Sequence, residues 1–203
     1  MDKNKRILLI VVLVLALVLG GAGLLYRQLS AGYTPEQLSL TGGAQVPAAS
    51  SPAAEKEEEA AQSQTAPDFT VYDAEGQAVK LSDYFCRPIV LNFWASWCGP
   101  CRSEMPDFNA AHETLGDQVQ FLMVNMTDGG RETVETAAEF IADAGYSFPV
   151  LFDKDMDAAG VYGVYSIPCT YFIAADGTVA ARASGAIDAN TLQKGLDMIL
   201  PEE

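Results

Sequence analysis

Two cysteines separated by two residues, Cys98 and Cys101, are the side chains in this sequence best suited to chemistry. Two thiols in one tight turn can reduce another disulfide by forming a disulfide of their own. The same spacing is also half of a zinc site. Because the chain has no second Cys-x-x-Cys pair and His112 is its only histidine, a zinc centre would lack its other ligands. The pattern therefore favours redox chemistry, and no metal is expected.

The residues around the pair indicate why one thiol would react. A nearly continuous apolar run over residues 88–95 predicts a buried strand that ends just before Cys98. Gly99 and Pro100 then open a predicted helix over residues 100–115. Backbone N–H groups at the start of a helix stabilise a thiolate, which is the form that attacks disulfides. The first cysteine is therefore predicted to attack, and the second to release the mixed disulfide.

Strands and helices are predicted to alternate along the rest of the carboxy-terminal part. Turn signals at residues 73–76 and at Asp176-Gly177 predict two hairpins. The spacing of apolar residues predicts strands over residues 119–126 and 148–153, and helices over residues 133–144, 157–163 and 188–200. Asp157 is expected to cap the short helix that it begins. This order predicts an α/β fold with a central mixed sheet flanked by helices.

The amino-terminal part of the chain has a different composition. Lys3, Lys5 and Arg6 precede nineteen residues without a charge, residues 7–25, which are long enough to cross a membrane. We interpret residues 1–26 as a membrane anchor, with a cleaved signal peptide as the alternative. Because the basic residues come first, the remainder is expected outside the cytoplasm. In both interpretations the rest of the chain is exported from the cytoplasm.

The exported part divides into a linker and a domain. Residues 27–66 are rich in Ala, Ser, Pro and Glu, which predicts a disordered linker. Residues 67–203 are numerous enough for one domain with a hydrophobic core. This domain has seven Lys or Arg against 21 Asp or Glu. Such an acidic balance argues against binding nucleic acid or anionic lipid, since both need basic partners.

The motifs resemble a known family. WCGPCRSEMP after LNFWAS, followed later by SIPCTYFI, is similar to the membrane-anchored proteins of the TlpA/ResA type. The resemblance covers residues 67–200, including the opening hairpin and an insert at residues 133–152. It implies a thioredoxin-like fold and a thiol–disulfide oxidoreductase that needs no cofactor, faces the cell exterior or periplasm and reduces exported proteins. Some members keep the haem-attachment cysteines of apocytochrome c reduced, and the analogy implies a transmembrane thiol carrier as electron donor.

The resemblance also implies roles for individual residues. Cys98 would be the attacking and Cys101 the resolving cysteine of a redox-active disulfide. Glu104 matches an acidic active-site residue of ResA-like proteins and is expected to move protons, with a solvated surface glutamate as the alternative. Pro168 matches a cis-proline that faces the cysteine pair. The residues expected to contact substrate are Trp97, Gly99, Pro100, Ile167 and Pro168.

Three positions need separate interpretation. Asn92 stands where cytoplasmic thioredoxins have a buried aspartate, and since an amide does not titrate, proton transfer would fall to Glu104 or water. Cys169 stands where the family usually has threonine or another small residue, and we interpret it as a small buried residue, with a third redox thiol as the alternative. Cys86 precedes the predicted central strand at its opposite end. No Cys86–Cys169 bridge is therefore expected.

Two other functions are alternatives to disulfide exchange. A thiol peroxidase of the peroxiredoxin type relies on a Pro-x-x-x-Thr-x-x-Cys setting, which this sequence lacks. A copper-binding or partner-binding module of the same fold is the second alternative. Copper carriers of this fold use Cys-x-x-x-Cys with a distant histidine, and neither feature is present. Disulfide exchange with exported proteins is therefore the predicted function.

Overall fold

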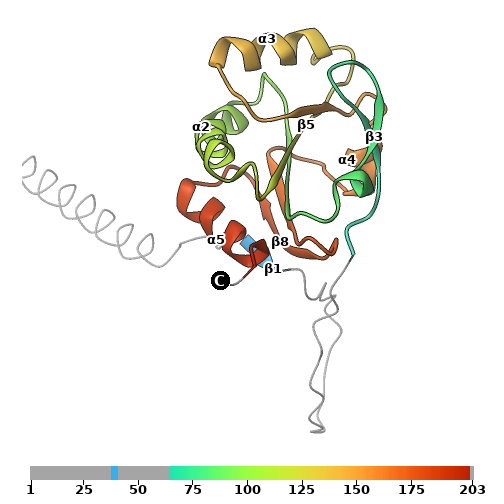
Figure 1. The fold of residues 1–203 in the computed structure, drawn as a ribbon. Helices are drawn as coiled ribbons and strands as arrows, with labels where there is room; N and C mark the ends of the chain where they lie inside the picture. Colours follow the sequence, from blue (N-terminus) through green and yellow to red (C-terminus); the bar gives the residue numbers. More distant parts are fainter. Residues whose placement is uncertain (1–37, 41–64, 202–203) are drawn as a thin grey trace, which may run out of the picture. The chain divides into compact units, whose positions relative to one another are not determined.

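A single mixed sheet forms the centre of the domain (Figure 1). The computed structural model describes residues 38–40 and 65–201. Its strands lie in the order β1-β8-β7-β4-β5-β6-β2-β3. The strands are β1 (Leu38–Leu40), β2 (Thr70–Tyr72), β3 (Ala78–Lys80), β4 (Ile89–Trp94), β5 (Gln120–Asn125), β6 (Val150–Phe152), β7 (Cys169–Ile173) and β8 (Val179–Ser184). The helices are η1 (Leu81–Tyr84), α2 (Gly99–Leu115), α3 (Val134–Ala144), α4 (Asp157–Val161) and α5 (Ala189–Ile199).

Strand β4 lies in the middle of this sheet and leads directly to the cysteine pair. All six of its residues are buried, as the continuous apolar run predicted. It pairs in parallel with β5 and antiparallel with β7, which confirms the expected mixed sheet. Both predicted hairpins, β2–β3 and β7–β8, are also present.

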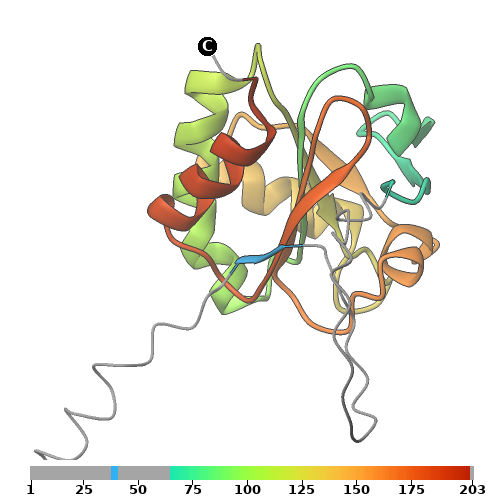
Figure 2. The same ribbon diagram turned by 90° about the horizontal axis from the view of Figure 1, so that it is seen from below.

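Helices cover both faces of the sheet. Helices α2 and α5 lie side by side on one face, as Figure 2 shows, and they share a core cluster with Phe108, Phe172 and Leu196. The opposite face is covered by α4 and by the segment from Ala66 to η1, around Phe69. The first of these clusters includes both cysteines of the Cys-x-x-Cys pair. Packing on this face therefore positions the redox site.

Helix α3 lies in the insert between β5 and β6, where a helix was expected. The Thr133 side chain accepts a hydrogen bond from the backbone N–H of Thr136, which caps the amino-terminal end of α3. Gly145 ends the helix with a φ of 70°, a conformation that a residue without a side chain adopts without strain. The helix is where the sequence predicted it, with Thr133 as its capping residue rather than its first helical residue.

The cap of the short helix α4 was predicted wrongly. Asp157 is the first residue of α4, and its carboxylate accepts a hydrogen bond from the backbone N–H of Thr70 instead. The buried carboxylate of Asp153 accepts hydrogen bonds from the backbone N–H groups of Ala158 and Ala159. Asp153 therefore accepts the hydrogen bonds of the N–H groups at the start of α4, although it lies five and six residues before them in the sequence. Local spacing does not reveal a capping residue at that separation.

The amino-terminal boundary of the domain also differs from the prediction. Thr65 forms a bridge with Thr178, and Ala66 is buried, so the folded part begins before residue 67. Leu38–Leu40, which fell inside the predicted disordered linker, forms β1 on the edge of β8. Three residues are too few to show strand periodicity, so β1 could not be predicted from the sequence. The remainder of that linker lies outside the described residues.

The predicted membrane anchor, residues 1–26, also lies outside the described residues. Within residues 38–40 and 65–201, none of the helices combines the length and apolar character needed to span a bilayer.

Candidate active site

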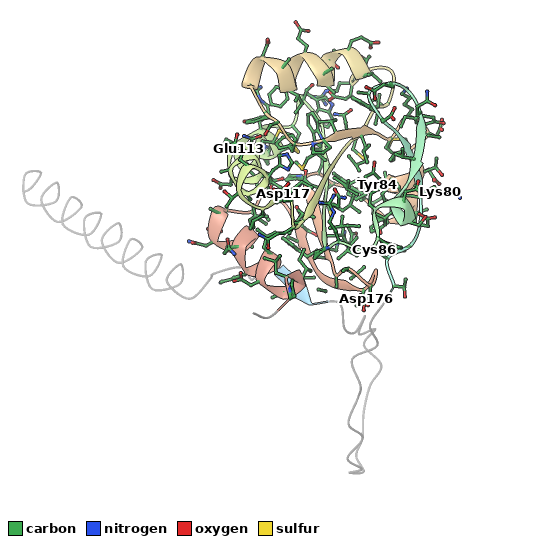
Figure 3. The ribbon with its side chains drawn as sticks, viewed as in Figure 1. Lys80, Tyr84, Cys86, Glu113, Asp117 and Asp176 are labelled. Carbon is green, nitrogen blue, oxygen red and sulfur yellow. A yellow bond between two sulfur atoms is a disulfide. The ribbon has the colours of Figure 1, made fainter. Side chains whose placement is uncertain are left out.

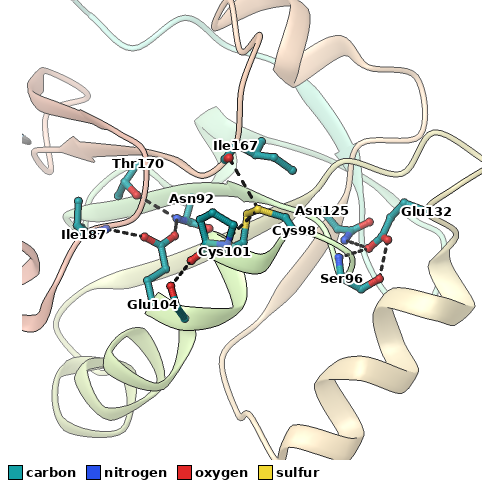
Figure 4. Close-up of a disulfide and its surroundings, with 12 residues drawn as sticks. Asn92, Ser96, Cys98, Cys101, Glu104, Asn125, Glu132, Ile167, Thr170 and Ile187 are labelled. Atoms are coloured by element: carbon teal, nitrogen blue, oxygen red, sulfur yellow. Dashed lines mark hydrogen bonds between the residues drawn. A yellow bond between two sulfur atoms is a disulfide. The ribbon is translucent and has the colours of Figure 1, made fainter. Parts of the chain in front are cut away.

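Cys98 and Cys101 form a disulfide at the start of α2 (Figure 4). Their Cα atoms are 5.3 Å apart. Cys98 is the residue that precedes the helix, and its Sγ accepts a hydrogen bond from the backbone N–H of Cys101 at 3.2 Å. Cys98 retains a small exposed area of 4%, whereas Cys101 has none. Only the first sulfur therefore offers access to another molecule.

The loop before β7 faces this disulfide. The Ile167–Pro168 peptide bond is cis, as the resemblance implied. The carbonyl oxygen of Ile167 lies 3.7 Å from Cys98 Sγ. The fold thus brings together two segments 69 residues apart, and the backbone next to Pro168 lies beside the accessible sulfur.

The residues on either side of Cys98 in the sequence, Trp97, Gly99 and Pro100, are exposed and form a rim around its sulfur. Trp97 is 42% exposed, and the guanidinium of Arg131 lies 3.8 Å from the centre of its ring. Gly99 and Pro100 are exposed as well. Tyr165, two residues before Ile167, is 99% exposed and was not among the residues predicted to contact substrate. Its signal in the sequence is an aromatic residue just ahead of the Ile-Pro pair.

Glu104 is buried one turn after Cys101, so the alternative of a solvated surface glutamate is wrong. It is 2% exposed and accepts hydrogen bonds from Asn92 Nδ2 and from the backbone N–H of Ile187, each at 2.9 Å. The pKa of the Glu104 carboxyl is raised to about 7, chiefly because burial disfavours the charged form; the two hydrogen bonds lower this pKa in part, and Asp107 adds a smaller increase. A carboxyl with this pKa can gain or lose a proton near neutral pH.

Asn92 links Glu104 to the strand after the cis-proline. Its side chain is fully buried, and its Nδ2 donates both to Glu104 and to Thr170 Oγ1, the latter at 3.0 Å. Its Oδ1 has no hydrogen-bond partner among the described residues. A half turn of the carboxamide would present this acceptor to Glu104 when the carboxyl carries a proton. The asparagine can thus accommodate both protonation states of its neighbour.

A second buried carboxylate, Glu132, lies on the other side of the disulfide and was missed by sequence reasoning. It is fully buried. Its Oε1 accepts hydrogen bonds from the backbone N–H of Ser96 at 2.7 Å and from Asn125 Nδ2 at 2.6 Å. Its Oε2 accepts a hydrogen bond from the Ser96 hydroxyl at 2.7 Å (Figure 4). A glutamate next to an arginine, in a polar loop, carries no sequence signal for such burial.

The other two cysteines do not join the site. Cys169 is 1% exposed and belongs to the core cluster on the face opposite that of Cys98, with Arg182 Nε 3.4 Å from its sulfur. This supports its interpretation as a small buried residue. Cys86 is exposed and lies near Asp176 at the turn of the β7–β8 hairpin (Figure 3). Both are free thiols, and the pairing of β7 with β4 is the predicted one.

The described residues contain no group of three or more His, Cys, Asp or Glu side chains that could hold a metal ion.

The geometry defines a class of protein: an accessible disulfide at a helix start, opposite a cis-proline, on a mixed sheet, is the site of a thioredoxin-fold thiol–disulfide oxidoreductase. Comparison with known proteins agrees. Residues 63–182 match the AhpC/TSA family. The thiol–disulfide oxidoreductase ResA of Geobacillus thermodenitrificans is 33% identical over 138 residues, which cover 68% of this chain and 77% of the relative.

Solved structures show the same relationship. A DsbF homologue from Corynebacterium diphtheriae is 29% identical with a TM-score of 0.58, covering 67% of this chain and 88% of its own. The exposed lipoprotein thioredoxin Etrx1 of Streptococcus pneumoniae is also 29% identical, with a TM-score of 0.54, covering 64% and 98%. The chain belongs to the AhpC/TSA family, and its named relatives there are ResA-type thiol–disulfide oxidoreductases.

Proposed function

We propose that this protein is a membrane-anchored, extracytoplasmic reductant of disulfides in exported proteins, acting through Cys98 and Cys101. The observation that carries the proposal is the position of Cys98, accessible at the start of α2 and 3.7 Å from the Ile167 carbonyl next to the cis-proline. Residues 1–26 would anchor the protein, the residues between this anchor and Thr65 other than β1 would form the linker, and β1 together with the chain from Thr65 onward would form the redox domain. The Streptococcus relative is itself an exposed lipoprotein, which supports this location.

The reaction begins from the reduced pair. The Cys98 thiolate, held by the N–H groups at the start of α2, attacks one sulfur of a substrate disulfide, and the other substrate sulfur leaves as a thiolate. Cys101 then loses its proton and attacks Cys98, which forms the Cys98–Cys101 disulfide and releases the second substrate sulfur. The substrate gains two electrons and the enzyme loses two.

Protons are exchanged next to the buried cysteine. Cys101 must lose a proton to attack, and Glu104 lies one turn further along the same face of α2. With its pKa raised to about 7 by burial, the Glu104 carboxylate can accept this proton and pass it on. Asn92, which donates to the carboxylate, holds Glu104 in place for this transfer.

The rim around Cys98 is the proposed docking site for the substrate chain. An extended substrate segment can pair with the backbone at Ile167 and Pro168, in the manner of an added strand. Trp97, Gly99 and Pro100 would contact the substrate on the other side of the sulfur. The preferred substrate class is a disulfide-bearing exported protein, and apocytochrome c is one candidate within it.

The direction of the reaction is proposed to be reductive. Thioredoxin, which shares Gly-Pro between its cysteines, has a potential of about −270 mV, whereas the strong oxidant DsbA lies at about −120 mV. Because exported proteins meet an oxidising environment, the oxidised pair must be reduced again by a donor, for which a transmembrane thiol carrier is proposed. A measured potential near that of DsbA would refute the reductive direction.

The central test is insulin reduction by the full-length protein with dithiothreitol as electron donor. The wild-type protein is expected to reduce insulin, Cys98→Ser to be inactive, and Cys101→Ser to accumulate mixed disulfides with substrates in cells. A Cys101→Ser protein that consumes peroxide with an external thiol, while the wild type leaves insulin intact, would instead support the thiol peroxidase. Stoichiometric Cu(I) binding without reductase activity would support the copper-binding module.

A further inference from the structure

Glu132 is a buried carboxylate that the reaction described above does not use. All three hydrogen bonds to its two oxygens come from Ser96 and Asn125, and none comes from a group that exchanges electrons or protons with the disulfide. Burying a carboxylate costs free energy unless hydrogen-bond donors compensate for the lost water, and Ser96 and Asn125 supply the donors here. These partners indicate the role of Glu132.

The first partner, Ser96, is two residues before the attacking cysteine. The Glu132 carboxylate accepts hydrogen bonds from the backbone N–H and from the hydroxyl of Ser96, each with a donor–acceptor distance of 2.7 Å. The second partner, Asn125, ends β5 and lies opposite Trp94, the last residue of β4. Glu132 therefore ties the loop between β4 and Cys98 to the end of the neighbouring strand.

The loop that carries Glu132 is itself held in one shape. Asp128 Oδ1 accepts hydrogen bonds from the backbone N–H groups of Gly130 and Glu132, and the N–H of Gly129 donates to the Glu132 carbonyl oxygen at 3.0 Å. Gly129 has a φ of 71°, which lets the chain turn there without strain. We refer to residues 128–132 as the clamp loop.

The clamp loop contacts two consecutive residues ahead of Cys98. Glu132 holds Ser96, and Arg131 lies over the ring of Trp97 at 3.8 Å. A cation is attracted to the face of an aromatic ring even at an exposed site, so this contact favours one orientation of the Trp97 ring. The two contacts together fix the backbone and the side chain that form one wall of the rim.

We propose that Glu132 is a positioning residue, which holds Ser96, and through it the adjacent Trp97, so that the rim beside Cys98 fits an extended protein substrate. This inference rests on the proposed function and adds to it the part of the chain that shapes substrate recognition. Glu132 acts through Ser96 and Trp97 and touches no reacting atom. A protein substrate needs the whole rim, whereas a small disulfide needs only access to the sulfur.

Two substitutions at Glu132 separate positioning from charge. In Glu132→Gln the amide oxygen can still accept from Ser96 N and Asn125 Nδ2, and its NH₂ can donate to the Ser96 hydroxyl, which accepts as well as donates. In Glu132→Ala the Ser96 N–H, the Ser96 hydroxyl and the buried Asn125 amide lose their acceptor, and the loop before Cys98 is released. Glutamine should therefore preserve the rim and alanine should not.

The test compares insulin with a small aromatic disulfide, 5,5′-dithiobis(2-nitrobenzoic acid), as substrates of the full-length protein. For Glu132→Ala we expect KM for insulin to rise about tenfold with kcat changed less than about twofold, and the rate with the small disulfide to stay within about twofold. Glu132→Gln should behave as wild type with both substrates. Glu139→Ala, an exposed glutamate of α3, is the matched control.

Each outcome decides the matter. An Ala variant that is folded and keeps the wild-type KM for insulin would overturn the inference, as would a Gln variant as impaired as Ala. If Glu132→Ala does not fold, Ser96→Ala combined with Arg131→Ala removes one contact from each arm of the clamp and should raise the insulin KM in the same way. A wild-type protein inactive on insulin would refute the proposed function instead, so the two failures are distinguishable.

Discussion

At the scale of single residues, the buried Glu104 makes stability depend on pH. Burial raises its pKa from 4.5 to about 7, so the folded chain binds this proton more tightly than the unfolded chain. Its contribution to stability is therefore fully present below about 4.5 and is lost as the pH rises through about 7. Relative to Glu104→Gln, which cannot ionise, the wild-type protein should lose roughly 3 kcal/mol between pH 4 and pH 8.

Urea unfolding of the oxidised full-length protein at both pH values measures this difference. Every other titrating group is shared by the two proteins, so its effect cancels when their stabilities are subtracted. The same substitution should also flatten the pH dependence of the reductase rate near neutral pH, since the proton acceptor next to Cys101 is removed. A stability difference that stays constant from pH 4 to pH 8 would mean that Glu104 does not change its protonation state there.

At the scale of elements, the approach of α5 to the sheet depends on one glycine. Gly195 is buried, and a Cβ at this position would overlap the ring of Phe172 on β7. Because that ring lies in the core cluster with α2 and α5, it has little room to move. Gly195→Ala should therefore lower the free energy of unfolding by about 1–3 kcal/mol, despite the better helix propensity of alanine.

Gly160 in α4 offers the matched control for this prediction. It is exposed, and a Cβ there would meet nothing within 4 Å. Gly160→Ala should therefore be neutral or add about 0.5–1 kcal/mol, because only helix propensity changes. Chemical unfolding of the two variants compares them directly. Equal effects at the two positions would show that α5 does not approach β7 as closely as the structure indicates.

The elements that position the site could be predicted because their signals are local. The apolar run of β4, the Gly-Pro start of α2 and the Asp176-Gly177 turn each lie within a few residues of the structure they specify. The start of α4 was assigned to the wrong aspartate, and β1 was missed, because both depend on groups distant in the chain. Asp153 and Asp157 look equivalent in the sequence, and only the fold distinguishes them.

Within the site as well, residues with a local sequence signal could be predicted, and residues whose partners are distant in the chain could not. The cysteine pair and Pro168 have characteristic neighbours, whereas Glu132 acquires its partner Ser96 only when segments 36 residues apart meet. For Glu104 the position was expected, but whether it was buried or solvated depended on Asn92 and Ile187 in the folded chain. Sequence spacing thus identified the reacting atoms, and the fold supplied their surroundings.

At the scale of the whole molecule, the proposed function requires the domain to lie outside the cytoplasm. The basic residues before the apolar stretch at residues 7–25 predict this orientation. The domain's acidic balance disfavours contact with anionic lipid, which suits a domain that exchanges electrons with soluble proteins. Only a measurement on cells distinguishes an exported domain from a cytoplasmic one.

Cys86 provides that measurement without any engineering. All four cysteines of the chain lie within the redox domain, and in the oxidised protein Cys98 and Cys101 are joined while Cys169 is buried. Cys86 is therefore the one exposed thiol of the described residues, and a membrane-impermeant maleimide should label it in intact cells as fully as after lysis. In intact cells treated first with an oxidant that closes the Cys98–Cys101 disulfide, Cys86→Ser should abolish the label, and a cytoplasmic thiol protein should stay unlabelled until lysis. Labelling of Cys86 only after lysis would place the domain in the cytoplasm, where the proposed role in reducing exported proteins fails even if the reductase chemistry is intact.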